Sequence, residues 1–162
     1  MAGYSGTPLP QKLGIKAGAR LGVLAAPATF AGTLGALPAG VVVNDGTRGS
    51  SPLDVIVCFV DSRAALARSF SRAQKRLDPR GGLWVCWPKK ASGVATDVTE
   101  HDVRSLGLAS GLVDNKVCAV DTVWSALRFV VRREERPRPA PAAAPKTSRK
   151  TAKGSVRTNA KR

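Results

Sequence analysis

The sequence predicts an α/β domain whose mostly parallel sheet ends in an antiparallel hairpin, followed by a disordered basic tail. Three observations support this. Apolar, strand-like runs alternate with helical patterns, the last two runs are joined by a short connection, and the composition changes abruptly near residue 133. With 43% hydrophobic residues, the 162-residue chain can bury one core without disulfides or metals. We place the domain at residues 1–133 and the tail at residues 134–162.

The expected elements follow from local patterns. Run 54–60 is continuously apolar and β-branched, which is typical of a strand covered on both faces. A short connection between the last two strands makes them an antiparallel pair. In chain order we expect a helical turn at 11–15, strands at 20–26, 41–43, 54–60 and 83–87, helices at 28–37, 62–77 and 99–107, and strands at 113–120 and 126–132.

Two helices have clear boundary signals. In the first, four apolar residues at helical spacing form one face, Asp61 or Ser62 supplies the N-cap, and Gly81–Gly82 follows its end. The basic residues of this helix, Arg76 included, lie largely off the apolar face. The second helix starts with a capping box from Thr99 to Asp102, and Gly107 is expected to end it.

This order of elements predicts a small Rossmann-like domain. Strand–helix–strand finished by an antiparallel hairpin, with LDPRGGLWV (77–85) before the fourth strand, resembles the C-terminal half of class I SAM-dependent methyltransferases (SAM, S-adenosyl-L-methionine). The resemblance covers residues 54–132. It implies a glycine-rich turn after the first strand and an acidic residue at the end of the second strand, where the cofactor's ribose binds.

The sequence meets one of these two requirements. Pro27 stands where the turn needs glycine, whereas Asp45 follows the second strand and is the candidate cofactor-binding residue. The alternative interpretation is that Asp45 is simply a turn residue in Asn-Asp-Gly. We assign no cofactor from the sequence.

The loop after the fourth expected strand is a candidate anion site. It emerges at the carboxyl edge of the sheet, where ligands of open α/β sheets bind, and two ammonium groups, a hydroxyl and a glycine lie close together there. The candidate residues are Lys89, Lys90, Ser92 and Gly93. The alternative is an ordinary solvated loop, because the spacing of a P-loop is absent.

Catalytic and metal sites are not predicted. The three cysteines lie in separate apolar runs and are expected to be reduced core residues. The single histidine, His101, is expected to face solvent, so no nucleophile–histidine pair or zinc site can be assembled. Charges on the last two strands, such as Asp114 and Lys116, are expected to protect a sheet edge.

The tail concentrates the positive charge. Residues 137–162 carry eight Lys and Arg and no acid, more than half of the net charge of +15. Such a segment resembles the tails of histone-like and ribosome-associated proteins, and releases counterions when it binds a polyanion. We expect nucleic acid or another polyanion as its partner; the alternative is a solubilising extension. The polyanion-binding residues are Arg138, Lys146, Arg149, Lys150, Lys153, Arg157, Lys161 and Arg162.

Several strings together resemble a bacterial family of small proteins known only as a domain of unknown function. They are SGTPLPQKLGI (5–15), WPKKASG (87–93), ATDVTE (95–100) and GLVDNKVCAVD (111–121). The resemblance spans residues 3–133 and assigns no catalytic residue. Two hypotheses remain: a non-enzymatic binding module with a polyanion-binding tail, or a methyltransferase-like protein, active or degenerate. We expect a cytoplasmic protein without a membrane span, because the uncharged stretch 21–43 is broken by prolines and glycines.

Overall fold

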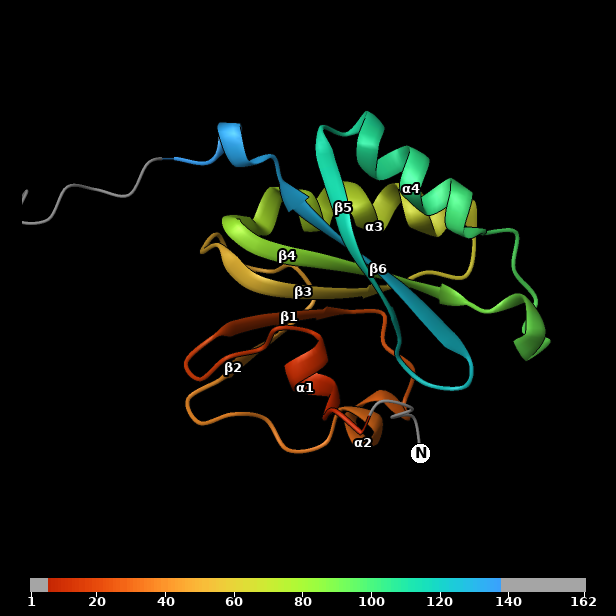
Figure 1. Ribbon diagram of the computed structural model, residues 1–162, viewed down its shortest axis with the longest axis horizontal. Helices are drawn as coiled ribbons and strands as arrows, with labels where there is room; N and C mark the ends of the chain where they lie inside the picture. The colour runs from red at the N-terminus through yellow and green to blue at the C-terminus, as the bar shows by residue number, and fades with distance from the viewer. Residues whose placement is uncertain (1–5, 138–162) are drawn as a thin grey trace, which may run out of the picture.

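The computed structural model describes residues 6–137, which form one six-stranded sheet with helices on both faces (Figure 1). The eight basic residues assigned to the tail lie outside the described residues. The elements are α1 (Leu9–Lys12), β1 (Arg20–Leu24), α2 (Phe30–Leu34), β2 (Val42–Asp45), β3 (Leu53–Phe59), α3 (Arg63–Arg76), β4 (Leu77–Pro88), the 3₁₀ turn η1 (Lys90–Ser92), α4 (Glu100–Ala109), β5 (Leu112–Ala119), β6 (Trp124–Val131) and the 3₁₀ turn η2 (Arg133–Glu135).

The strand order is β2-β1-β3-β4-β6-β5. The first four strands in this order are mutually parallel, and β6 is antiparallel to both β4 and β5. The predicted mostly parallel sheet with a terminal hairpin is therefore confirmed. Strands β2 and β5 form the two edges, and Lys116 on β5 is exposed there, as predicted for an edge charge.

The two faces of the sheet are covered unequally. The α3–α4 face carries helices of 14 and 10 residues, and the α1–α2 face carries helices of 4 and 5 residues. Each face has its own core: Phe70 and Phe129 pack edge-to-face on the first, and Phe30, Phe59 and Trp124 form a similar aromatic chain on the second. Trp84 and Trp87 lie in different cores, because alternate residues of β4 face opposite sides.

Strand β4 starts six residues earlier than predicted. Residues 78–82 were expected to separate the helix that ends at residue 77 from the strand that starts at residue 83, but Leu77 pairs with Leu53 and the strand continues through the two glycines. Close approach of backbone requires glycine at Gly81, where an added Cβ would lie 2.4 Å from the Asp54 carbonyl oxygen. At Gly82 an added Cβ would lie 2.3 Å from the Arg128 Nε atom, so that side chain would have to shift. Sequence alone does not distinguish a turn glycine from one crowded by neighbouring strands.

Helix α4 continues to Ala109, so the prediction that Gly107 ends it is wrong. The Phe129 ring packs so closely on the helix that a Cβ at Gly107 would lie 2.0 Å from a ring carbon. Helix α2 is shorter than predicted, because Gly35 has a φ of 75° and its N–H bonds to Ala31. The predicted caps are confirmed: Ser62 caps α3, and Thr99 with Asp102 forms a capping box on α4.

The three cysteines are free and buried, as predicted. Burial raises the pKa of the Cys58 thiol to about 12, with a weaker opposing effect of Ser69, and burial also raises the pKa of Cys86 and Cys118. None of these thiols is an activated nucleophile. Within residues 6–137, no helix is long and apolar enough to cross a membrane, and no cluster of His, Cys, Asp or Glu suits a metal ion.

Candidate functional site

The carboxyl ends of β1, β2 and β3 meet at one edge of the sheet, on the right-hand side of Figure 1. In the strand register, Val23 lies opposite Asp45 and Leu24 lies opposite Cys58. The segment after β1 therefore starts between the ends of two neighbouring strands. Ligands of open α/β sheets bind at this edge, because loops there are free to shape a site above a rigid sheet.

The turn after β1 contains an alanine in the left-handed backbone conformation that usually requires glycine. Ala25 has a φ of 55° and is the one non-glycine residue between 6 and 137 with positive φ. The sequence analysis looked for glycine at Pro27, but Pro27 instead accepts a hydrogen bond from the Phe30 N–H, 3.0 Å, at the start of α2. In this turn Ala25 and Ala28 are exposed, and Ala26 is half-buried against the core of the α1–α2 face.

Asp45 is the last residue of β2. The alternative interpretation had placed it in the turn that follows. Its side chain is exposed and makes no hydrogen bond or ion pair with any residue between 6 and 137. The turn that follows is held without it: the Gly46 N–H donates to the Val23 carbonyl at 2.8 Å, and the Asn44 side chain donates to the Gly46 carbonyl at 3.0 Å. A free carboxylate therefore stands next to the Ala25 turn.

A buried arginine holds the β2–β3 loop near the start of β3, because Arg76 directly precedes Leu77, which pairs with Leu53. Arg76 at the end of α3 was expected to lie off the apolar face, but it is buried and donates to the carbonyls of Thr47, Arg48 and Ser51 in the β2–β3 loop. Several carbonyl dipoles satisfy a buried guanidinium without a carboxylate. Sequence analysis missed this role because the contact partners lie 25 to 29 residues away along the chain.

The predicted anion loop uses most of its polar groups internally. The Lys89 ammonium donates to the Asp121 carbonyl at 2.8 Å, and the Ser92 hydroxyl donates to the Lys89 carbonyl at 2.6 Å. Lys90 is exposed, and Gly93 has a φ of 77° that closes the η1 turn. The loop is thereby tied to the β5–β6 turn. The four residues remain close together, and anion binding by them remains a prediction.

A cleft of about 980 Å³ lies between α1, the start of α2 and the β5–β6 turn. Thr29, Thr33 and Lys12 contribute polar groups to its lining. The Asp121 carboxylate, which also lines it, accepts hydrogen bonds of 2.8 Å from the N–H groups of Val123 and Trp124 and so shapes the turn. The volume is at the upper end of the range of ordinary small-molecule sites.

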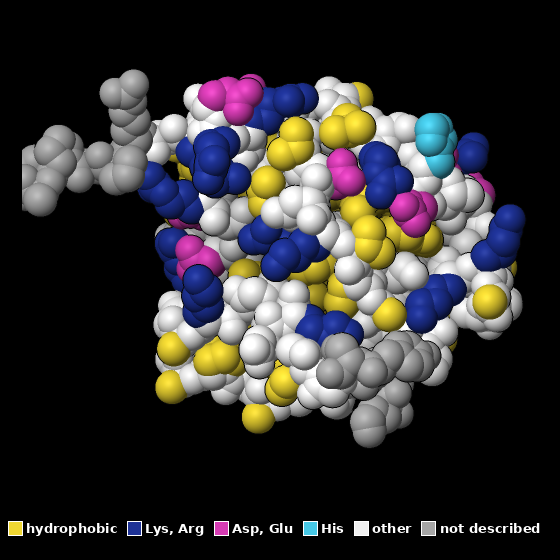
Figure 2. Space-filling view, viewed as in Figure 1, with side chains coloured by type: hydrophobic (Ala, Val, Ile, Leu, Met, Phe, Trp, Pro, Cys, Tyr) yellow, Lys and Arg dark blue, Asp and Glu magenta, His cyan; other side chains and the backbone are white. Residues whose placement is uncertain are grey.

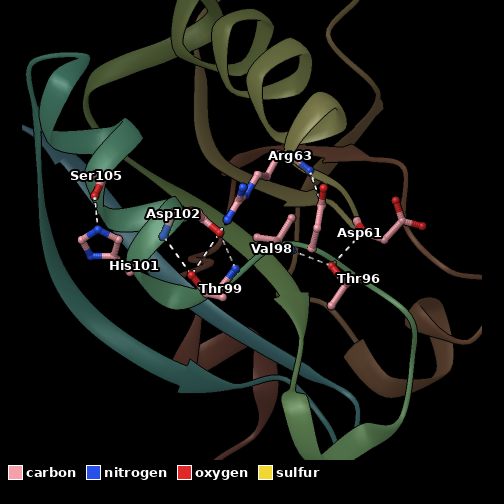
Figure 3. Close-up of polar contacts among 9 residues, drawn as sticks. Asp61, Arg63, Thr96, Val98, Thr99, His101, Asp102 and Ser105 are labelled. Carbon is pink, nitrogen blue, oxygen red and sulfur yellow. Dashed lines mark hydrogen bonds and ion pairs between the residues drawn. The ribbon is translucent and has the colours of Figure 1, made fainter.

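The starts of α3 and α4 are joined by a polar network at the same edge (Figure 3). The Asp102 carboxylate accepts from the Thr99 N–H at 2.9 Å and from the Arg63 side chain at 3.3 Å, while the Thr96 hydroxyl donates to the Asp61 carbonyl at 2.8 Å. The hydrogen bonds from the Thr99 backbone and side chain, and then the charge of Arg63, outweigh burial and keep the pKa of Asp102 below its ordinary value. This network positions the loops above β3 and β4.

Two further polar residues at this edge, His101 and Asp61, have exposed side chains. His101 is exposed and contacts only Ser105, at 3.4 Å, within the described part of the chain, which agrees with the prediction that it faces solvent (Figure 3). Asp61 directly follows the buried strand β3, and its side chain is exposed. Sequence analysis treated Asp61 only as a helix cap, although an acid directly after a covered strand signals a position at the carboxyl edge.

The class of fold is clear from comparison with solved structures. The fibrillarin pre-rRNA processing protein of Methanococcus jannaschii matches with a TM-score of 0.55 and 11% identity, over 72% of this chain and 68% of that one. A SAM-dependent methyltransferase from Aquifex aeolicus matches with a TM-score of 0.51 and 14% identity, over 74% of this chain and 85% of that one. The domain therefore has the α/β fold of SAM-dependent methyltransferases.

A third structure adds a bound cofactor to this comparison. Aeropyrum pernix fibrillarin, in complex with natively bound SAM, matches with a TM-score of 0.52 and 14% identity, over 80% of this chain and 71% of that one. The likeness thus extends beyond residues 54–132, where the sequence first indicated it. At these identities it shows the fold alone. No family model matches the chain, and no curated protein matches it.

Proposed function

We propose that this protein is a methyltransferase-like domain that binds SAM at the carboxyl edge of β1 and β2. The observation that carries the proposal is the unpaired Asp45 carboxylate at the end of β2, beside the glycine-like turn at Ala25. A free carboxylate at this position suits the two neighbouring hydroxyls of a ribose. The small residues of the turn let the ligand approach the backbone closely, and in this respect the residues fit the cofactor.

The chain's own residues have separate tasks in this proposal. Asp45 accepts hydrogen bonds from the ribose hydroxyls, and the turn at residues 25–28 supplies the backbone surface. SAM, when bound, supplies an electrophilic methyl group on a sulfonium. The cleft between α2 and the β5–β6 turn is large enough for a second small molecule. The proposal concerns cofactor binding, with methyl transfer as the activity that this arrangement would serve.

Titration of the full chain with SAM tests the proposal. Trp124 is a suitable fluorescence reporter, because it is half-buried at this edge and packs against Phe59 with ring centroids 5.0 Å apart. We expect saturable binding that Asp45→Asn weakens by about tenfold or more, since a hydrogen bond to a charged group is lost. Glu134→Gln removes an exposed carboxylate elsewhere and should leave binding unchanged. A wild-type protein that shows no saturable response to SAM contradicts the proposal.

A second function is favoured by the charge distribution. We propose that residues 137–162 bind nucleic acid or another polyanion, supported by their eight basic residues without an acid. If all eight contacted phosphates, the slope of log affinity against log salt would approach about −7. Deleting residues 137–162 should flatten this slope and weaken binding at low salt. Equal affinity and an equal slope after the deletion would rule out this role.

A further inference from the structure

A second cavity, of about 470 Å³, lies on the α1–α2 face toward the amino ends of the strands. We call it the basic groove, because five of its lining residues are cations. They are Lys12, Lys16, Arg80, Lys116 and Arg128. Figure 2 shows Lys and Arg side chains in the middle of the displayed face, between α1 and the strands β4 and β6. The groove lies away from the carboxyl edge, and one of its cations, Arg80, donates a hydrogen bond of 2.8 Å to the Pro137 carbonyl.

The one acidic residue that lines the groove does not neutralise these cations. The Asp54 carboxylate accepts hydrogen bonds from the Arg20 side chain at 3.2 and 3.3 Å and from the Arg20 N–H at 2.8 Å. Burial disfavours the charged form of Asp54, but these hydrogen bonds outweigh burial and keep its pKa below the ordinary value. Because Asp54 is already paired with Arg20, the groove retains its positive charge.

Arg128 is held in an unusual position at the centre of the groove. It is half-buried on β6, directly opposite Lys116 on β5, so two like charges share a cross-strand pair. Its guanidinium lies over Gly82, where a larger residue would require the guanidinium to shift. Between residues 6 and 137, Arg128 has no hydrogen bond and no carboxylate partner.

This arrangement is unfavourable unless an anion occupies it. Like charges directly opposite each other destabilise a sheet, and a half-buried guanidinium without a partner loses hydration. Burial, and secondarily the charge of Arg136, lowers the pKa of Arg128. Planar guanidinium groups are well suited to bidentate recognition of phosphate, and the lysines add further positive charge.

We propose that the basic groove binds closely spaced phosphate groups, with Arg128 and Lys116 as the central contacts. The volume exceeds the roughly 300 Å³ at which small-ligand sites begin, and cations dominate the charged lining. The groove therefore suits a diphosphate better than a large apolar ligand. A free diphosphate and the backbone of a nucleic-acid strand both present this chemistry.

The test compares two double variants of the full chain. Lys116→Gln with Arg128→Gln removes two charges from the groove, and Arg68→Gln with Arg72→Gln removes two exposed charges from α3 on the opposite face. We expect the affinity for inorganic pyrophosphate at low ionic strength to fall about tenfold or more in the groove variant and less than about twofold in the α3 variant. The groove variant should also melt at a higher temperature, because the like-charge pair is gone.

A second titration identifies the source of the phosphates. With an abasic deoxyribose-phosphate oligomer, an affinity that is weaker in the groove variant than in the α3 variant indicates a nucleic-acid backbone. Equal affinities with the oligomer, together with the loss of pyrophosphate binding, indicate a free diphosphate. If the groove variant misfolds, Lys12→Gln with Lys16→Gln replaces it. The proposal is wrong if wild-type protein shows no saturable pyrophosphate binding, or if groove and α3 variants lose affinity equally.

Discussion

The two faces of the sheet differ in how completely they are covered. On the α3–α4 face, two long helices with side-chain caps enclose a core that includes Phe70, Phe129 and Trp87. On the α1–α2 face, two helices of four and five residues without side-chain caps leave both the cleft and the basic groove open. The difference teaches that one side of the sheet carries most of the regular helical packing, whereas the cavities that our proposals use lie on the other side.

The largest expected effect is the loss of stability when a core phenylalanine is truncated, and it should differ between the two faces. Phe70→Ala should destabilise the protein by about 3–5 kcal/mol, because the cavity forms beneath a long helix that cannot collapse into it. Phe30→Ala should cost less, because α2 has only five residues and its neighbours can relax. Chemical denaturation of both variants measures the difference. Equal losses would show that the α1–α2 face is as rigid as the other.

A matched pair of glycines gives the next largest effect, with opposite signs. Gly107→Ala should destabilise by about 1–3 kcal/mol, because the new methyl group meets the Phe129 ring. Gly32→Ala in α2 meets nothing within 4 Å and should stabilise by about 0.5–1 kcal/mol through helix propensity. Thermal melting of both variants checks the signs. A stabilised Gly107→Ala protein would contradict the close packing of α4 on β6.

Substitutions at the helix N-caps should also destabilise the α3–α4 face more than the α1–α2 face, by a smaller amount. Thr99→Ala removes the capping box of α4 and should cost about 0.5–2 kcal/mol, whereas Thr29→Ala should cost little, because Thr29 makes no side-chain cap on α2. The comparison is made by urea denaturation at neutral pH. If the two variants were equally destabilised, the capping box would not be the stabilising contact.

The capping box also predicts a pH dependence. Folding lowers the pKa of Asp102, so its stabilising contribution is present above about pH 4, the ordinary value of an unfolded aspartate, and is lost as the pH falls through the lower folded value. Asp102→Asn should therefore be less stable than wild type at neutral pH, and the difference should shrink in acid. A difference that is independent of pH would assign the effect to the lost hydrogen-bond geometry alone.

The smallest effect concerns the turn after β1. Ala25→Gly should stabilise by about 0.5 kcal/mol, since the cost of a left-handed alanine, about 1–2 kcal/mol, exceeds the entropic cost of glycine, about 0.5–1 kcal/mol. SAM binding should be retained, because the backbone conformation is unchanged. A destabilised variant would mean that the Ala25 methyl group makes packing contacts that outweigh its strain.

The sequence by itself determined the class of the fold and most of its elements. The β-branched run before Asp61, the helical spacing of Leu66 and Phe70, and the caps at Ser62 and Thr99 all depend on interactions within a few residues, so they can be read locally. For the same reason, Asp45 was recognised as following the second strand. The mostly parallel sheet and its terminal hairpin follow from connection lengths.

Only the tertiary structure decided the features that join distant segments. Gly107 lies within a helix where the Phe129 ring packs on it, and Gly81 lies within a strand where the Asp54 backbone approaches it closely. Burial of Arg76 beneath the β2–β3 loop and the gathering of five cations in one groove likewise bring together residues far apart in sequence. These contacts were not predicted, because the neighbouring sequence does not show whether a glycine lies in a turn or in a packed interior. Nor does it show whether an arginine is exposed or buried.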